Sequence, residues 1–179
     1  RLTAPQERAL GETLADLGRA TPMTRLLQGD VGSGKTIVAA LAALAAVEAG
    51  YQVAFMAPTE LLAEQHFNKL SHWLAGLPVT ITWLTGSLTA AELKAAQAAC
   101  ARGETHIAIG THALFQKKVS FARLGLVVVD EQHRFGVEQR LALRSRGARD
   151  SERALAPHTL MMSATPIPRS LAMSYYADL

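Results

Sequence analysis

The segment Gly29–Thr36, with the sequence GDVGSGKT, constrains the fold more than any other part of this 179-residue chain. It matches the phosphate-binding pattern G-x-x-x-x-G-K-[ST] in full. A short strand-like run, Arg25–Gln28, leads into it, and an uninterrupted apolar run, Ile37–Val47, follows it. Such a loop holds a phosphate between the end of a strand and the N-terminus of a helix, where backbone N–H groups and the helix dipole favour an anion. The segment therefore predicts an α/β domain assembled around a phosphate-binding loop.

Strand-like and helical runs alternate along the whole chain. We expect strands over Arg25–Gln28, Val53–Ala57, Val79–Leu84, His106–Gly110, Leu126–Asp130 and Thr159–Ser163. We expect helices near Pro5–Leu17, Lys35–Ala49, Glu60–Leu74, Thr89–Ala101, Val137–Arg146 and Pro168–Tyr176. This alternation predicts an α/β fold with a mostly parallel sheet and helices on both of its faces. Because no linker or second composition block interrupts it, residues 1–179 are predicted to form a single domain.

Composition excludes several other classes of protein. Hydrophobic residues make up 49% of the chain and charged residues 18%, which argues against a disordered tail or a coiled coil. The single cysteine, Cys100, excludes a disulfide scaffold and a cysteine-rich zinc module. The longest apolar run is shorter than the roughly 20 residues that span a bilayer, so we expect no membrane partner and a cytoplasmic location. Since the chain begins with Arg1 rather than Met, we expect it to be part of a longer protein.

Positive charge is concentrated in one stretch, although the whole chain carries a net charge of only +3. Residues 117–153 contain nine Lys and Arg against five Asp and Glu. This excess favours a phosphate-rich partner such as nucleic acid. On charge alone, a solvated helix face and loop explains it equally well.

The phosphate-binding loop supplies candidate ligands for ATP and Mg²⁺. Its glycines let the backbone curl so that successive N–H groups point at phosphate oxygens. Lys35 is expected to reach the β- and γ-phosphates, and the Thr36 hydroxyl is expected to ligate Mg²⁺. The predicted nucleotide-binding residues of this segment are Gly29, Asp30, Val31, Gly32, Ser33, Gly34, Lys35 and Thr36.

An acidic pair follows the apolar run Leu126–Val129. Asp130 ends the expected strand and is the predicted partner of Mg²⁺, because a phosphate-binding loop needs a carboxylate at the end of another core strand to hold the hydrated metal. Glu131 is predicted to polarise the attacking water, which a hydrolase requires and a nucleotide kinase generally does not. Taken without the loop, the pair would equally suit an exposed acidic turn. With the loop, it predicts ATP hydrolysis.

Several phrases resemble the motifs of superfamily 2 helicases. Asp130-Glu131-Gln132-His133 is similar to their DExH box, and Ser163-Ala164-Thr165 is similar to their SAT motif. Longer phrases resemble the RecG-type branched-DNA translocases of that superfamily: APTELLAEQH, GTHALFQ, VDEQHRFGVEQRLAL and SATPIPRSLAM. The resemblance covers essentially the whole chain. It implies a RecA-like P-loop NTPase fold and, within it, the first of two motor domains.

The resemblance also assigns roles that the residues alone do not. It implies that Gln6 recognises adenine and that His133 joins Lys35, Asp130 and Glu131 as a catalytic residue, bridging the metal site and the SAT segment. Contact with nucleic acid, or coupling to it, is implied for Pro58, Thr59, Gly110, Thr111, Arg134, Ser163 and Thr165. Read without the resemblance, Thr59 is a helix N-cap and Arg134 begins a turn into a helix. Thr59 can serve both purposes, because a capped helix N-terminus also binds anions.

The function implied by the resemblance is an ATP-driven DNA motor that remodels branched DNA, such as stalled forks and Holliday junctions, in repair and recombination. Its implied partners are branched DNA and a second RecA-like domain of the same chain. That domain and a branch-binding wedge domain are absent from the sequence, so this part alone is expected to hydrolyse ATP weakly. Three alternatives stay open: the motor of a transcription-repair coupling factor-like translocase, a P-loop nucleotide kinase or transferase, and a binding module without catalysis.

Overall fold

A computed structural model of the protein describes residues 2–18, 24–28, 34–115, 119–131, 157–163 and 176–178. Over these residues the helices are α1 (Ala4–Leu17), α2 (Lys35–Glu48), α3 (Glu60–Trp73), α4 (Ala90–Arg102) and the single turn α5 (His112–Phe115). The strands are β1 (Thr24–Gln28), β2 (Gln52–Ala57), β3 (Ile81–Leu84), β4 (Ile107–Thr111), β5 (Leu124–Glu131), β6 (His158–Ser163) and β7 (Tyr176–Asp178).

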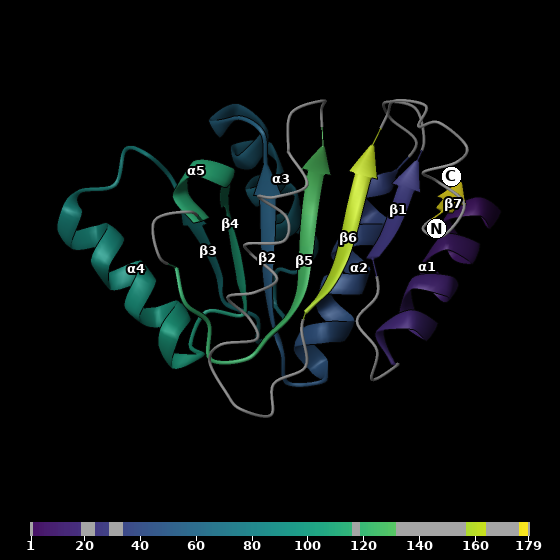
Figure 1. The fold of residues 1–179 in the computed structure, drawn as a ribbon, viewed down its shortest axis with the longest axis horizontal. Helices are drawn as coiled ribbons and strands as arrows, with labels where there is room; N and C mark the ends of the chain where they lie inside the picture. The colour runs from purple at the N-terminus through teal and green to yellow at the C-terminus, as the bar shows by residue number, and fades with distance from the viewer. Residues whose placement is uncertain are drawn as a thin grey trace.

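The strands form one 7-stranded sheet in the order β3-β4-β2-β5-β6-β1-β7 (Figure 1). Every strand pair among the described residues is parallel. All carboxyl ends therefore lie at one edge of the sheet, where the arrowheads of β5, β6 and β1 point in Figure 1. Between β1 and β2 the sheet has two further positions, which β5 and β6 occupy. The strands β1, β6 and β5 are therefore neighbours although they are far apart in sequence.

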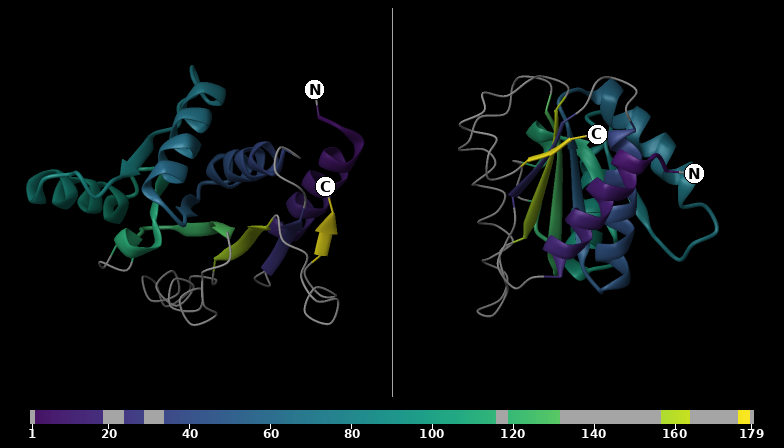
Figure 2. Two further views of the ribbon diagram at one scale, coloured as in Figure 1. Left: turned by 90° about the horizontal axis from the view of Figure 1, so that it is seen from above. Right: turned by 90° about the vertical axis from the view of Figure 1, so that its right-hand side faces the viewer.

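Both faces of the sheet are buried, which explains the continuous apolar runs. In β2, Val53 and Phe55 pack into the core that α1, α2 and α3 cover, whereas Ala54 and Met56 pack into a second core that includes Phe115. Figure 2 shows α1, α2 and α3 together on one side of the sheet. The predicted α/β class, with a parallel sheet and helices on both faces, is confirmed.

Threonines begin three of the four long helices that the structure describes. The hydroxyls of Thr3, Thr59 and Thr89 each accept the backbone N–H of the residue three positions later in the chain. This bond satisfies a donor that the helix itself leaves unpaired. The fourth helix, α2, begins differently, at a glycine with no side-chain cap. Within the described residues, no helix combines the length and apolarity needed to cross a membrane.

The predicted strands agree with the structure to within two residues at each end. Two of them start later than predicted, β4 at Ile107 instead of His106 and, by more, β3. The run expected from Val79 begins at Ile81, because the Thr80 N–H donates to His106 Nδ1 at 2.8 Å instead of joining the ladder. The ends of the first four predicted helices differ from the structure by at most one residue. Ala49, Leu74 and Thr89, which the prediction counted as helical, are cap residues.

The prediction of a helix over Pro168–Tyr176 is wrong at Tyr176, which begins β7. Tyr176–Asp178 pairs with the outer edge of β1, a long-range contact that overrides local helical periodicity. The rest of that predicted helix, and the helix predicted over Val137–Arg146, lie outside the described residues. The single-turn helix α5 and strand β7 were not predicted from the sequence.

Candidate nucleotide and nucleic-acid site

The strand ends that lead into three sequence motifs lie side by side at the carboxyl edge of β1, β6 and β5. Ser163 at the end of β6 pairs with Gln28, the last residue of β1, and on its other side with Glu131, the last residue of β5. Gln28 directly precedes the phosphate-binding segment, Ser163 begins the SAT phrase, and Glu131 belongs to the acidic box. The three segments therefore leave the sheet from one row of paired residues, where open α/β sheets bind their ligands.

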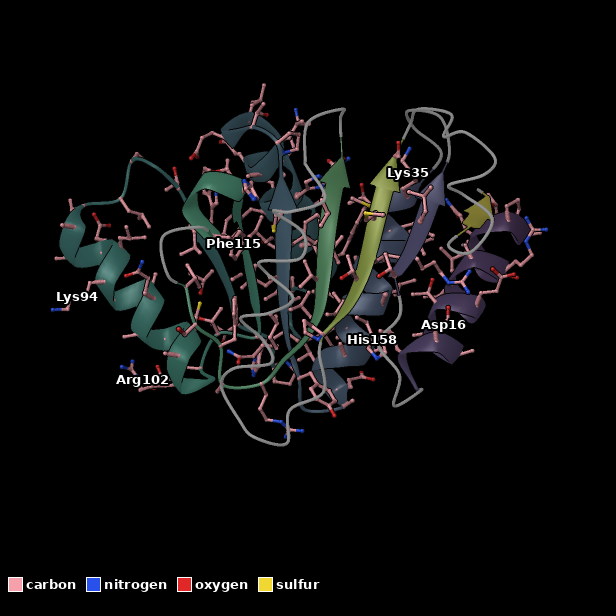
Figure 3. The ribbon with its side chains drawn as sticks, in the orientation of Figure 1. Asp16, Lys35, Lys94, Arg102, Phe115 and His158 are labelled. Carbon is pink, nitrogen blue, oxygen red and sulfur yellow. The ribbon has the colours of Figure 1, made fainter. Side chains whose placement is uncertain are left out.

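The N-terminus of α2 is built around Gly34. This residue has φ +84°, the left-handed region that residues with a Cβ rarely occupy, and the helix has no side-chain cap. Lys35 and Thr36 form its first turn, and Figure 3 shows Lys35 at the carboxyl end of the sheet. No N-cap side chain occupies the first backbone N–H groups of α2. Anion binding at a helix N-terminus uses these groups.

Gln6 lies directly beside this turn. A Cβ built on Gly34 would lie 1.8 Å from Gln6 Nε2, so the Gln6 side-chain amide can keep this position only beside a glycine and would have to turn away from any larger residue. Gln6 also completes a capping box, because its Oε1 accepts the Thr3 N–H at 2.9 Å. The structure thus brings the predicted adenine-recognising glutamine next to Gly34, the last glycine of the predicted phosphate loop.

Asp130 forms a hydrogen bond that the sequence did not suggest. Its Oδ2 lies 2.7 Å from Nε2 of His66 on α3, and the two side chains are 14% and 7% exposed. The sequence could have indicated that His66 is buried, because its spacing places it on the same helix face as Ala63 and Leu70, the other buried residues of α3. Residue spacing alone indicates only that the histidine is buried and says nothing of its partner.

The predicted nucleic-acid residues gather at the same edge on the neighbouring strands. Ala57 pairs with Thr111 across β2 and β4, so Pro58 and Thr59 leave the sheet beside Thr111. Thr59 is the exposed N-cap of α3, as predicted, and its hydroxyl accepts the Leu62 N–H at 3.2 Å. A capped N-terminus at this position still presents the helix dipole to an anion.

Gly110 has a packing role that the sequence did not indicate. It is buried in β4, and a Cβ there would lie 2.9 Å from the Leu84 carbonyl oxygen in β3. Only a glycine lets these two backbones approach so closely.

Glu60, the first residue of α3, also contributes unexpectedly. Its two carboxylate oxygens accept the Thr85 hydroxyl at 3.0 Å and the Gly86 N–H at 2.9 Å. These bonds fix the loop after β3 to the N-terminus of α3.

Other predicted site residues lie outside the described part of the chain. They are Gly29, Asp30, Val31, Gly32, Ser33, His133, Arg134 and Thr165. For Glu131 the structure describes the backbone position at the end of β5.

The donors at this edge fit a hydrated magnesium ion. Thr36 offers a hydroxyl and Asp130 a carboxylate, both hard oxygen donors, and Mg²⁺ binds through one or two carboxylates, waters and substrate phosphates rather than an all-protein cage. Among the described residues, no group of three or more His, Cys, Asp and Glu side chains forms such a cage.

Comparison with known proteins gives sequence relatives over the whole chain. The ATP-dependent DNA helicase RecG of Aquifex aeolicus (strain VF5) is 56% identical over 179 residues, which is 100% of this chain and 22% of that protein. The ATP-dependent DNA helicase RecG of Escherichia coli (strain K12) is 54% identical over 177 residues, which is 99% of this chain and 25% of that protein. The chain therefore spans about a quarter of the length of these relatives.

Solved structures show the same fold. The structure of RecG bound to a three-way DNA junction matches with a TM-score of 0.82 and 43% identity, covering 98% of this chain and 22% of that one. The Pyrococcus furiosus Hef helicase domain matches with a TM-score of 0.67 and 22% identity, covering 94% of this chain and 34% of that one, which is a likeness of fold alone. The predicted RecA-like fold is confirmed. A profile of DEAD/DEAH box helicases matches residues 3–174, and the chain belongs to that family.

Proposed function

We propose that this chain is the first RecA-like motor domain of an ATP-dependent helicase that remodels branched DNA, such as stalled forks and junctions, in repair and recombination. The chain's relatives are named ATP-dependent DNA helicase RecG, and one of them was solved on a three-way DNA junction. The chain spans about a quarter of their length, which supports a second RecA-like domain as its partner.

The observation that carries the proposal is the row Gln28, Ser163 and Glu131 across three neighbouring strands. It supports a nucleotide site in which the phosphate loop, the acidic box and the SAT phrase act on one ligand. A nucleotide kinase has no use for the SAT phrase at this edge.

The nucleotide half of the site acts on ATP. Lys35 and the N-terminus of α2 would bind the phosphates, Gln6 would recognise adenine, and Thr36 and Asp130 would hold Mg²⁺. When bound, the metal supplies positive charge that polarises the phosphoryl oxygens. Glu131 would orient the attacking water and take its proton, with His133 linking this site to the SAT segment.

The other half of the edge contacts DNA. Pro58, Thr59, Gly110 and Thr111 would bind the phosphodiester backbone, which needs small side chains and backbone N–H groups and reads no sequence. Arg134, Ser163 and Thr165 would couple that contact to the nucleotide.

ATP hydrolysis by the intact protein tests the proposal, measured without DNA, with linear duplex and with a three-way junction. We expect the junction to stimulate hydrolysis most. Lys35→Ala and Glu131→Gln should each lower the rate by about 10² or more, the loss typical of removing one charge-stabilising group. Lys94→Ala, at an exposed position on α4, is the matched control and should leave the rate unchanged. Phosphate transfer to a small acceptor, or hydrolysis indifferent to DNA, would contradict the proposal.

A further inference from the structure

The hydrogen bond between His66 and Asp130 joins α3 to the end of β5. Its length is 2.7 Å, from Nε2 to Oδ2, and both side chains are largely shielded from solvent. The two residues are 64 positions apart in sequence, so the contact exists only because β2, from which α3 follows, pairs with β5.

The imidazole of His66 is fixed by packing as well as by this bond. Its ring centroid lies 4.8 Å from that of Phe55 in β2, with the planes tilted by 44°. Nδ1 is buried and has no hydrogen-bond partner among the described residues. Because a carboxylate only accepts hydrogen bonds, the Nε2–H of His66 is the donor to Asp130 Oδ2.

We propose that His66 is a positioning residue that orients the Asp130 carboxylate toward bound Mg²⁺. The inference rests on the proposed function, in which Asp130 holds the metal. A carboxylate that ligates a metal or its water needs a partner to set its rotation, and such partners strongly affect metal affinity. His66 occupies Oδ2 and so fixes the direction of the second oxygen, Oδ1.

The position of His66 also connects the two halves of the edge. Thr59 caps α3, and His66 lies seven residues further along, two helical turns or about 10 Å away. One rigid helix therefore carries the proposed DNA-binding cap at its start and the partner of the metal-binding carboxylate at its middle.

The test measures binding of a non-hydrolysable ATP analogue to the intact protein, with Mg²⁺ and with a chelator. His66→Phe keeps a ring but removes the donor, and should weaken binding about tenfold in Mg²⁺, the loss typical of removing a ligand's hydrogen-bond partner. Binding in the chelator should not change. His66→Gln places an amide donor near the position of Nε2 and should restore most of the affinity. His72→Phe, at an exposed position on the same helix, is the matched control.

Further variants separate the possible outcomes. Equal weakening with and without Mg²⁺, or no weakening at all, would overturn the inference. Should His66→Phe fail to fold, His66→Asn replaces it, since the shorter amide stays polar but does not reach Asp130. Asp130→Asn tests the proposed function itself. Analogue binding by this variant must no longer depend on Mg²⁺, and adding His66→Phe to it must not weaken that binding further. Loss of Mg²⁺ dependence in Asp130→Asn but not in His66→Phe would refute the inference and leave the proposed function intact.

Discussion

The two halves of the carboxyl edge begin their helices in opposite ways. On the β1, β6 and β5 half, α2 starts at Gly34 in a left-handed conformation with no side-chain cap. On the β2 and β4 half, α3 starts at Thr59, whose hydroxyl caps the helix. A side-chain cap satisfies a backbone N–H at the start of a helix without a ligand. A helix that starts at an uncapped glycine can instead bind an anion with its first N–H groups. Under the proposed function, this difference predicts tight phosphate binding in the first half and a looser backbone contact in the second.

The boundary between the halves runs between β2 and β5. Phe55 on β2 and Asp130 on β5 both contact His66, so α3 spans that boundary. The substitutions below affect both halves, then one half, then neither, and their expected effects decrease in that order.

The largest effect is expected from Gln52→Ala at the amino end of β2, which supports both halves. The buried Gln52 amide donates to the carbonyls of Cys100 and Thr105 at 2.9 and 2.8 Å and accepts the Arg123 N–H at 2.8 Å. The substitution leaves two buried carbonyls and the part-buried Arg123 N–H without this partner, and at about 1–3 kcal/mol for each buried group it should lower the free energy of unfolding by roughly 3 kcal/mol. Urea denaturation at constant m-value measures it.

The control for Gln52 is Gln65→Ala at an exposed position on α3, which should change the free energy of unfolding by less than about 0.5 kcal/mol. The ratio of nucleotide to DNA affinity in folded Gln52→Ala should match that of the wild type. A selective loss of either affinity would show that Gln52 serves one half only.

The next effect is expected from Gly34→Ala and should be confined to the nucleotide half. Gly34 and Gly76 have nearly equal φ, +84° and +83°, so alanine at either costs about 1–2 kcal/mol in backbone strain. Only at Gly34 does the new Cβ meet another group, Gln6, whereas nothing lies within 4 Å at Gly76. The Gln6 amide would turn away to make room, and losing its proposed hydrogen bond to adenine, about 1.4 kcal/mol, should weaken ATP-analogue binding about tenfold. Equal analogue affinity in the two variants would refute the role given to Gly34.

Local patterns in the sequence predicted the parts of this edge that depend on nearby residues. The spacing of the phosphate loop located Gly34 and the start of α2, and the residue type of Thr59 identified a cap. The bond from His66 to Asp130 and strand β7 escaped prediction, because each depends on a partner distant in sequence. Sheet order is a property of such pairings, so the row Gln28, Ser163 and Glu131 could be found only in the structure.

A smaller effect is expected from Thr59→Val, on the DNA half. Thr59 and Thr89 cap their helices through hydrogen bonds of 3.2 and 3.1 Å, so valine at either should cost about 1 kcal/mol of stability. Junction DNA should bind only the Thr59 variant more weakly, by about fivefold, as expected for one lost contact of about 1 kcal/mol. Fluorescence anisotropy at fixed salt measures this, because affinity for DNA depends strongly on ionic strength. Equal DNA affinity in the two variants would remove Thr59 from the DNA-binding half.

The smallest effect is expected from His158, at the amino end of β6 and away from both halves. Burial lowers the pKa of His158 below its ordinary value of 6.5, against the opposing influence of the Asp16 charge and a hydrogen bond with the Leu17 backbone. Figure 3 shows His158 and Asp16 at this end of the sheet. Since the unfolded chain then takes up a proton more readily than the folded one, the contribution of His158 to stability is complete above pH 6.5 and is lost as the pH falls toward the lower folded pKa.

The free energy of unfolding should therefore fall less between pH 7.5 and pH 5.5 in His158→Gln than in the wild type or in His72→Gln. The affinities for the ATP analogue and for DNA at pH 7.5 should stay unchanged. A steeper fall in His158→Gln would mean that the attraction of Asp16 outweighs burial and that this end of β6 favours the charged imidazole.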